Sequence, residues 1–129
     1  MRKDHRASPT ILLVEDDEIN RKLLRQLLED YGHRIFEAGD GLDALKIAKH
    51  EIPLLILMDV DLPGLDGIGI TRRIREDAAL RETFILIITA FDTKEVRAAA
   101  FDAGCNEFLT KPLDINKLKT LLSSVLHEQ

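Results

Sequence analysis

The sequence predicts an α/β fold in which five helices cover both faces of a doubly wound, five-stranded parallel sheet. Five short apolar runs alternate with longer segments of helical period, which is the pattern of repeated strand–helix units. Two of the runs, Leu54–Met58 and Phe84–Ile88, are continuously apolar, as in central strands that are buried on both faces. The length of 129 residues suits a single domain.

The five strands are expected at the apolar runs. In chain order these runs are Thr10–Val14, a weaker run at His33–Phe36, Leu54–Met58, Phe84–Ile88 and Glu107–Leu109. The connections between parallel strands are right-handed, so each strand–helix unit winds in the same sense. The helices are therefore expected on both faces of the sheet.

The helices are expected between the strands, where apolar residues recur three or four positions apart. The first helix ends at Gly32 as its C-cap, the second closes before Pro53, the third begins after Gly67, and the fourth ends at Gly104. The periodic positions are Ile19, Leu23, Leu24, Leu27, Leu28 and Tyr31; Leu42, Leu45 and Ala48; Ile70 and Ile74; Val96, Ala99, Ala100 and Ala103; and Leu118, Leu121, Leu122 and Val125.

Residues 1–9 are expected to form a flexible polar tail, and residues 10–129 one domain without a linker or an output domain. The longest apolar run, Leu54–Met58, is far shorter than the roughly 20 residues of a membrane-spanning helix. No apolar stretch of signal-peptide type follows the basic N-terminus, so export is not indicated. These features predict a protein of the cytoplasm.

The charge and the cysteine count exclude other classes of protein. The formal net charge is −5, which disfavours direct binding to the phosphate backbone of nucleic acid. Cys105 is the one cysteine, so no internal disulfide can form, and no cluster of cysteine and histidine has zinc-ligand spacing.

Polar residues gather where the predicted strands end. They are Glu15, Asp16 and Asp17 after the first strand, Asp59 after the third, Thr89 after the fourth and Lys111 after the fifth. The carboxyl ends of parallel strands share one edge, where such folds bind ligands. Several carboxylates in one place repel one another, so the cluster indicates a bound cation or raised pKa values. Mg²⁺ prefers oxygen ligands, keeps several waters and leaves room for a phosphoryl group.

Each of these residues also has an ordinary structural explanation. Asp16 and Asp17 could cap the first helix, and Asp59 could form local hydrogen bonds in a turn. Thr89 could cap the next helix, and Lys111 could be a surface lysine. These separate explanations do not predict that all of them reach the same edge of the sheet, which favours a functional cluster.

Four motifs, in order and at these intervals, resemble those of response regulator receiver domains, the CheY-like family. They are ILLVEDD at 11–17, LMDVDLPGLDG at 57–67, ITA at 88–90 and FLTKP at 108–112. The resemblance covers nearly the whole chain from Thr10 onward and implies a flavodoxin-like fold with strand order 2-1-3-4-5. The Glu15–Asn20 segment is also similar to that of single-domain regulators of polar cell-cycle control.

The resemblance implies that Asp59 accepts a phosphoryl group from a sensor histidine kinase or a histidine phosphotransfer protein. It implies Mg²⁺ as the cofactor. Asp17 and Asp59 would bind the ion through their carboxylates, Asp16 would help through water, and Asp61 would contribute its backbone carbonyl.

The same resemblance implies a switch. Lys111, aimed by a cis peptide at Pro112, would pair with a phosphate oxygen, and the hydroxyl of Thr89 would move toward another. Phe108 matches the rotating aromatic of the family, although an ordinary core phenylalanine fits the position equally well. Phosphorylation would then change protein binding on the face of the fourth helix, fifth strand and fifth helix, in a monomer or a phosphorylation-dependent dimer.

Two positions depart from the usual pattern. Asp61 is often an uncharged residue in the family, and Phe91 lies two residues past Thr89. Both flank the path by which water would attack the phosphate, so both bear on its lifetime. We expect the bulky Phe91 to lengthen that lifetime.

Three alternatives remain. The Asp59–Asp61 segment resembles the DxD motif of haloacid dehalogenase-type phosphatases, but that family places the motif on its first strand. The chain could instead be a receiver from a hybrid kinase or a multidomain regulator. It could also be a scaffold that works without phosphate, although none of the expected site residues is missing. We expect a phosphoacceptor signalling domain that assists only its own phosphorylation and dephosphorylation, and not an enzyme.

Overall fold

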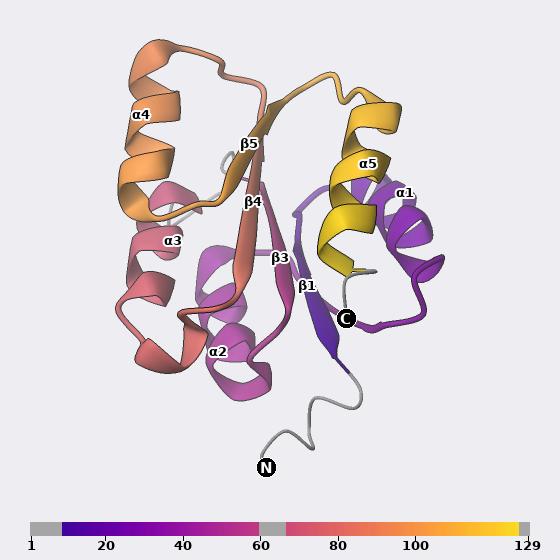
Figure 1. The fold of residues 1–129 in the computed structure, drawn as a ribbon, viewed down its shortest axis with the longest axis horizontal. Helices are drawn as coiled ribbons and strands as arrows, with labels where there is room; N and C mark the ends of the chain where they lie inside the picture. Colours follow the sequence, from indigo (N-terminus) through magenta and orange to yellow (C-terminus); the bar gives the residue numbers. More distant parts are fainter. Residues whose placement is uncertain (1–8, 60–66, 127–129) are drawn as a thin grey trace.

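The computed structural model describes residues 9–59 and 67–126, and it contains the predicted α/β architecture (Figure 1). Its five strands form one parallel sheet in the order β2-β1-β3-β4-β5. The strands are β1 (Thr10–Val14), β2 (Arg34–Ala38), β3 (Leu55–Asp59), β4 (Phe84–Thr89) and β5 (Glu107–Thr110). The fold class and the strand order are confirmed. The predicted flexible tail lies, apart from Pro9, outside the described residues.

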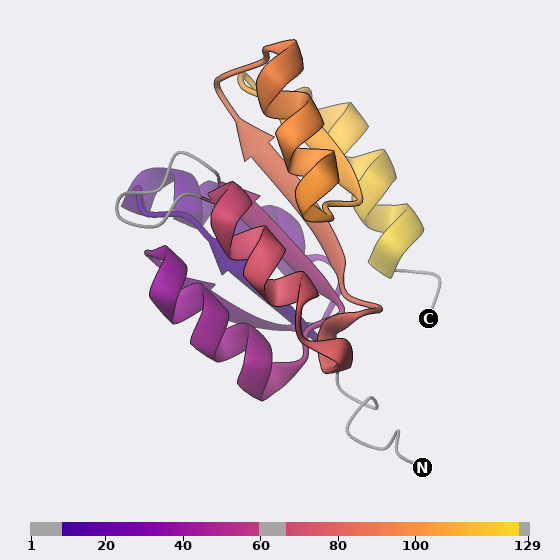
Figure 2. The same cartoon turned by 90° about the vertical axis from the view of Figure 1, so that its left-hand side faces the viewer.

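The five predicted helices are all present, and they cover both faces of the sheet. Helices α2, α3 and α4 lie on one face, and α1 and α5 lie on the other (Figures 1 and 2). The helices are α1 (Glu18–Glu29), α2 (Gly41–Glu51), α3 (Gly67–Arg75), α4 (Lys94–Ala103) and α5 (Ile115–Leu126), with a short 3₁₀ helix, η2 (Ala78–Leu80), that the sequence pattern did not predict. None of the described helices is long and apolar enough to span a bilayer.

The core is divided in two by the sheet, because successive side chains of a strand point to opposite faces. In β1, Leu12 and Val14 pack with α2, α3 and α4, whereas Ile11 and Leu13 pack with α1 and α5. The same alternation continues in β3 and β4, with Ile56, Met58, Ile85 and Ile87 on the first side and Leu55, Leu57, Leu86 and Ile88 on the second. Burial on both faces explains why the central strands are continuously apolar.

The helix ends follow local chemistry. Asp40 and Thr93 cap α2 and α4 with side chains that accept hydrogen bonds from backbone N–H groups of the first turn. Gly104 ends α4 as predicted, with a φ of 114° that favours glycine. Helix α1 ends at Glu29 rather than continuing to Gly32, because tighter three-residue hydrogen bonds close its last turn.

Candidate functional site

Three carboxylates meet at the carboxyl edge of the sheet. Each of Glu15, Asp16 and Asp59 places a carboxylate oxygen within 4.8 Å of the others. Asp59 is the last residue of β3 and is only 5% exposed, and Glu15 follows β1 and is 2% exposed. Asp16 lies on the solvent side of the group. The predicted acidic cluster therefore exists, with one buried pair and one exposed member.

Asp17 has a helix-capping role in the structure, and its role as a metal ligand stays a prediction. Asp17 is the N-cap of α1, with extended backbone angles, and its carboxylate accepts a hydrogen bond from the N–H of Asn20 at 2.9 Å. This is the capping role that was the ordinary explanation for the residue. Among the described residues, Glu15 and Asp16, and not Asp17, group with Asp59.

The alternation of β1 and β3 explains why Glu15 points toward Asp59. Leu13 pairs with Leu57 in the parallel register, and both side chains lie on the α1–α5 face. Glu15 and Asp59 each lie two residues further along the chain, so their side chains point to the same face as Leu13 and Leu57. The same count was available in the sequence and could have identified Glu15.

The environment of Glu15 opposes its ionisation. Burial, together with the charge and hydrogen bonding of neighbouring Asp59, raises the pKa of Glu15 from its ordinary value of 4.5 to about 7. The N–H of Asp17 and the charge of Lys111 act in the opposite direction but do not cancel this rise. Burial is thus the main reason why the charged form of Glu15 is disfavoured.

Lys111 supplies the basic group of the site. It follows β5, and its Nζ donates a hydrogen bond to Oδ2 of Asp59 at 3.1 Å. Its backbone N–H donates to the carbonyl of Thr89 at 2.8 Å, which joins the ends of β4 and β5. The Lys111–Pro112 peptide bond is cis, as the family resemblance implied.

Thr89 and Phe108, the two predicted switch residues, are both buried. Thr89 is the last residue of β4, and its hydroxyl accepts a hydrogen bond from the N–H of Phe91 at 3.0 Å. The ring of Phe108 belongs to the core shared with α2, α3 and α4, and the guanidinium carbon of Arg97 in α4 lies 4.6 Å from its centroid. The side chain of Phe91 is 62% exposed.

An apolar cavity of about 320 Å³ borders the site. Leu23, Leu24 and Leu27 of α1 form one wall, and Asp59 and Lys111 lie at its lining as well. The predicted backbone contact of residue 61 lies outside the described residues.

The comparisons with known proteins point to one family. The family described as response regulator receiver domain matches residues 11–123. The polar-differentiation response regulator DivK of Brucella ovis is 33% identical over 117 residues, covering 91% of this chain and 95% of that protein.

Solved structures agree with this match. The receiver domain of sensor histidine kinase PA1611 from Pseudomonas aeruginosa, solved with a magnesium ion in its active-site cleft, has a TM-score of 0.82 at 33% identity, with coverage of 93% of this chain and 98% of that one. The chemotaxis protein CheY4 of Vibrio cholerae has a TM-score of 0.83 at 27% identity, with coverage of 92% and 99%. The predicted resemblance to receiver domains and to polar cell-cycle regulators is confirmed.

Proposed function

Because the chain belongs to the response regulator receiver domain family, we propose that it accepts a phosphoryl group on Asp59 and signals through a change in protein binding. The observation that carries the proposal is the setting of Asp59. Its carboxylate ends a central strand, contacts Lys111 at 3.1 Å and adjoins two further acids. A buried carboxylate that lies between the Lys111 ammonium group and two further acids is suited to phosphoryl transfer, a reaction in which negative charge on the phosphoryl oxygens must be neutralised.

Magnesium is the cofactor of this proposal. Glu15, Asp16 and Asp59 present hard oxygen donors within 4.8 Å of one another, which suits Mg²⁺. Burial is the main cause of the raised pKa of Glu15, and the charge of Asp59 adds to it, so a divalent cation at this site would favour the ionised form of Glu15. Glu15 therefore replaces Asp17 in the proposed ligand set. When bound, Mg²⁺ would offset the negative charge that develops on the phosphoryl oxygens.

The chain's own residues would carry out the transfer. An oxygen of Asp59 attacks the phosphorus of a phosphohistidine, a P–O bond forms, and the P–N bond to the imidazole breaks. The leaving imidazole takes up a proton. Lys111 exchanges its contact with Asp59 for one with a phosphoryl oxygen, and the hydroxyl of Thr89 approaches another. The movement of Thr89 is the first step of the proposed switch.

The switch is proposed to reach the face formed by α4, β5 and α5. Phe108 lies on β5 in the core, and both Arg97 and Phe101 of α4 contact its ring. A change at Thr89 would thereby alter the packing of α4 on β5 and shift the populations of two arrangements. The downstream protein would bind one of these arrangements more tightly.

The phosphodonor partner is proposed to be a sensor histidine kinase or a histidine phosphotransfer protein of the cytoplasm. The apolar cavity beside Asp59, walled by the leucines of α1, offers that partner contact area next to the acceptor. A phosphatase of the haloacid dehalogenase type is disfavoured because Asp59 ends the third strand and not the first. Turnover of p-nitrophenyl phosphate by the wild type would revive that alternative.

The direct test is intact-protein mass spectrometry after incubation with acetyl phosphate and Mg²⁺. We expect one added phosphoryl group on the wild type, and none on Asp59→Asn or in the presence of EDTA. Asp92→Asn is the matched control, because it removes an exposed aspartate of the β4–α4 loop, and it should still be phosphorylated. A wild type that gains no phosphoryl group would refute the proposed function.

A further inference from the structure

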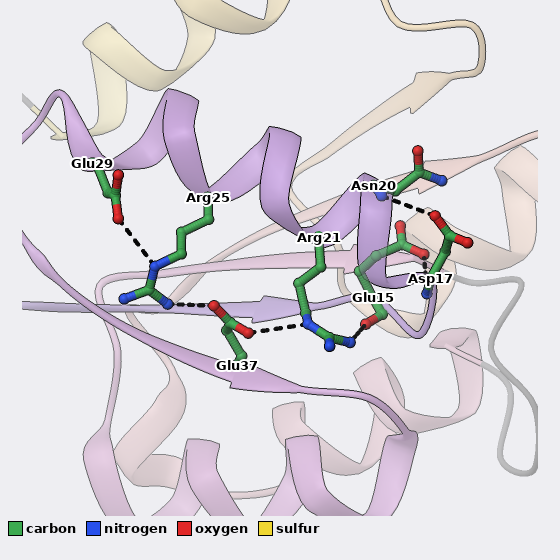
Figure 3. A network of polar contacts seen from close by, with 7 residues as sticks. All are labelled: Glu15, Asp17, Asn20, Arg21, Arg25, Glu29 and Glu37. Atoms are coloured by element: carbon green, nitrogen blue, oxygen red, sulfur yellow. Dashed lines mark hydrogen bonds and ion pairs between the residues drawn. The ribbon is translucent and has the colours of Figure 1, made fainter.

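We infer that Arg21 is a positioning residue. It holds the acidic turn, Glu15–Asp17, in the shape required for cation binding. The inference rests on the proposed function, since the cation in question is the proposed Mg²⁺. Arg21 belongs to the first turns of α1, and among the described residues its partners in Figure 3 are the Glu15 carbonyl and the carboxylate of Glu37. Its Nη1 atom donates a hydrogen bond to the backbone carbonyl of Glu15 at 2.9 Å. It would therefore act on the site through the backbone.

The backbone of Glu15 needs such a partner because β1 has ended. The N–H of Glu15 donates to the carbonyl of Ala38 at 3.0 Å, which is the last bond that joins this segment to β2. The carbonyl of Glu15 lies beyond the β1 ladder, and a buried carbonyl without a partner costs free energy. Arg21 provides that partner. With the bond from Asp17 N–H to the Glu15 carboxylate, it fixes the turn that aims the acid at Asp59.

Arg21 is itself held by a chain of ion pairs (Figure 3). Its Nε lies 3.0 Å from Oε1 of Glu37 on β2, and Arg25 pairs with the other carboxylate oxygen of Glu37. Arg25 also pairs with Glu29 at 3.1 Å. The side chain of Arg21 is three-quarters buried, and its planar guanidinium binds Glu37 and the Glu15 carbonyl at the same time. The network thus ties α1 and β2 to the acidic turn.

The sign of the expected effect separates positioning from simple electrostatics. Arg21 carries a positive charge near a proposed cation site, so its removal would by field alone strengthen Mg²⁺ binding. If Arg21 instead shapes the turn, its removal weakens binding, because residues that orient metal ligands typically change affinity by 10- to 100-fold. The two accounts predict opposite changes.

The test is Mg²⁺ affinity by isothermal titration calorimetry of the whole chain. Arg21→Met should weaken binding about tenfold. Arg21→Lys keeps the positive charge but lacks the planar guanidinium group, so we expect it to weaken Mg²⁺ binding as well. Arg25→Met is the matched control, because it removes the same charge from the same helix and from the same partner, Glu37, without touching Glu15. Its affinity should stay within about twofold of the wild type.

A second measurement does not depend on the metal. Hydrogen exchange of the Asp17 amide, which donates to the Glu15 carboxylate, should be faster in Arg21→Met than in the wild type or Arg25→Met. Equal or tighter Mg²⁺ binding by Arg21→Met, or an equal loss in Arg25→Met, would overturn the inference. A wild type that binds no Mg²⁺ would overturn the proposed magnesium site. The exchange rate of the Asp17 amide would then decide whether Arg21 shapes the turn.

Discussion

The substitution Glu15→Gln should stabilise the protein without Mg²⁺ at high pH and have little effect at low pH. The pKa of Glu15 is raised in the folded state from 4.5 to about 7. Below pH 4.5 the carboxyl is protonated in both states and costs nothing. Between pH 4.5 and about 7 the unfolded chain is ionised while the folded chain stays protonated, so stability falls as the pH rises and the loss is complete above about 7. Glutamine has the same shape and carries no charge, which removes this cost.

The magnitude follows from the difference between the two pKa values. At about 1.4 kcal/mol for each pH unit, a rise from 4.5 to about 7 corresponds to at most about 3 kcal/mol. Solvent beside exposed Asp16 reduces the figure, so we expect roughly 1–3 kcal/mol at pH 8. Most of the change between wild type and variant should develop between about pH 5 and pH 7.

Urea unfolding of both proteins with EDTA at pH 5 and pH 8 measures the effect. The comparison cancels every other titrating group that the substitution leaves unchanged. A second series with saturating Mg²⁺ should favour the wild type, because its carboxylate is a proposed ligand and ligand binding stabilises the folded state. A stability difference that is the same at pH 5 and pH 8 would refute the reasoning.

Three further substitutions test separate parts of the structure. Gly104→Ala should lower the free energy of unfolding by about 1–3 kcal/mol in urea titrations. The φ of Gly104 is 114°, and the added Cβ would lie 2.5 Å from Cγ of Arg75. An unchanged free energy of unfolding would contradict the described turn. Asp17→Ala removes an N-cap and should cost about 1 kcal/mol of stability. Calorimetry should still find a Mg²⁺ affinity within about twofold of the wild type. A larger loss of affinity would restore Asp17 to the ligand set. Lys111→Met should slow phosphorylation of Asp59 by acetyl phosphate about 100-fold in timed mass spectrometry, and an unchanged rate would remove Lys111 from the mechanism.

Most of the fold could be predicted from the sequence because the signals for it are local. Continuous apolar runs locate the central strands, and helical spacing with terminal glycines locates the helices. Gly104 shows the link directly, since it was predicted as a C-cap and ends α4 in the left-handed conformation. The end of α1 was missed because Gly32 lies in the following turn, three residues beyond Glu29, and tertiary context determined where the helix closed.

The candidate site was predicted in part. The positions of Asp59, Thr89 and Lys111 at strand ends follow from the pattern of the chain, because parallel strands bring their carboxyl ends to one edge. The structure places Lys111 beside Asp59 and buries Thr89 at the end of β4. Arg21 carried no recognisable signal, since an arginine on an amphipathic helix is ordinarily a solvated residue.

The sequence by itself determined where the strands lie and which acids lie close to their ends, and the family resemblance implied the order of the strands. Strand alternation in the sequence pointed to Glu15, but only the tertiary structure decided where β1 ends and where α1 begins, and so which acid caps the helix. Glu15 keeps the parity of β1 and points at Asp59, Asp16 faces solvent, and Asp17 caps α1. The physical reason is that side-chain direction reverses at each residue of a strand and changes again where the chain enters a helix. A shift of one position therefore separates a buried member of the site from a helix cap.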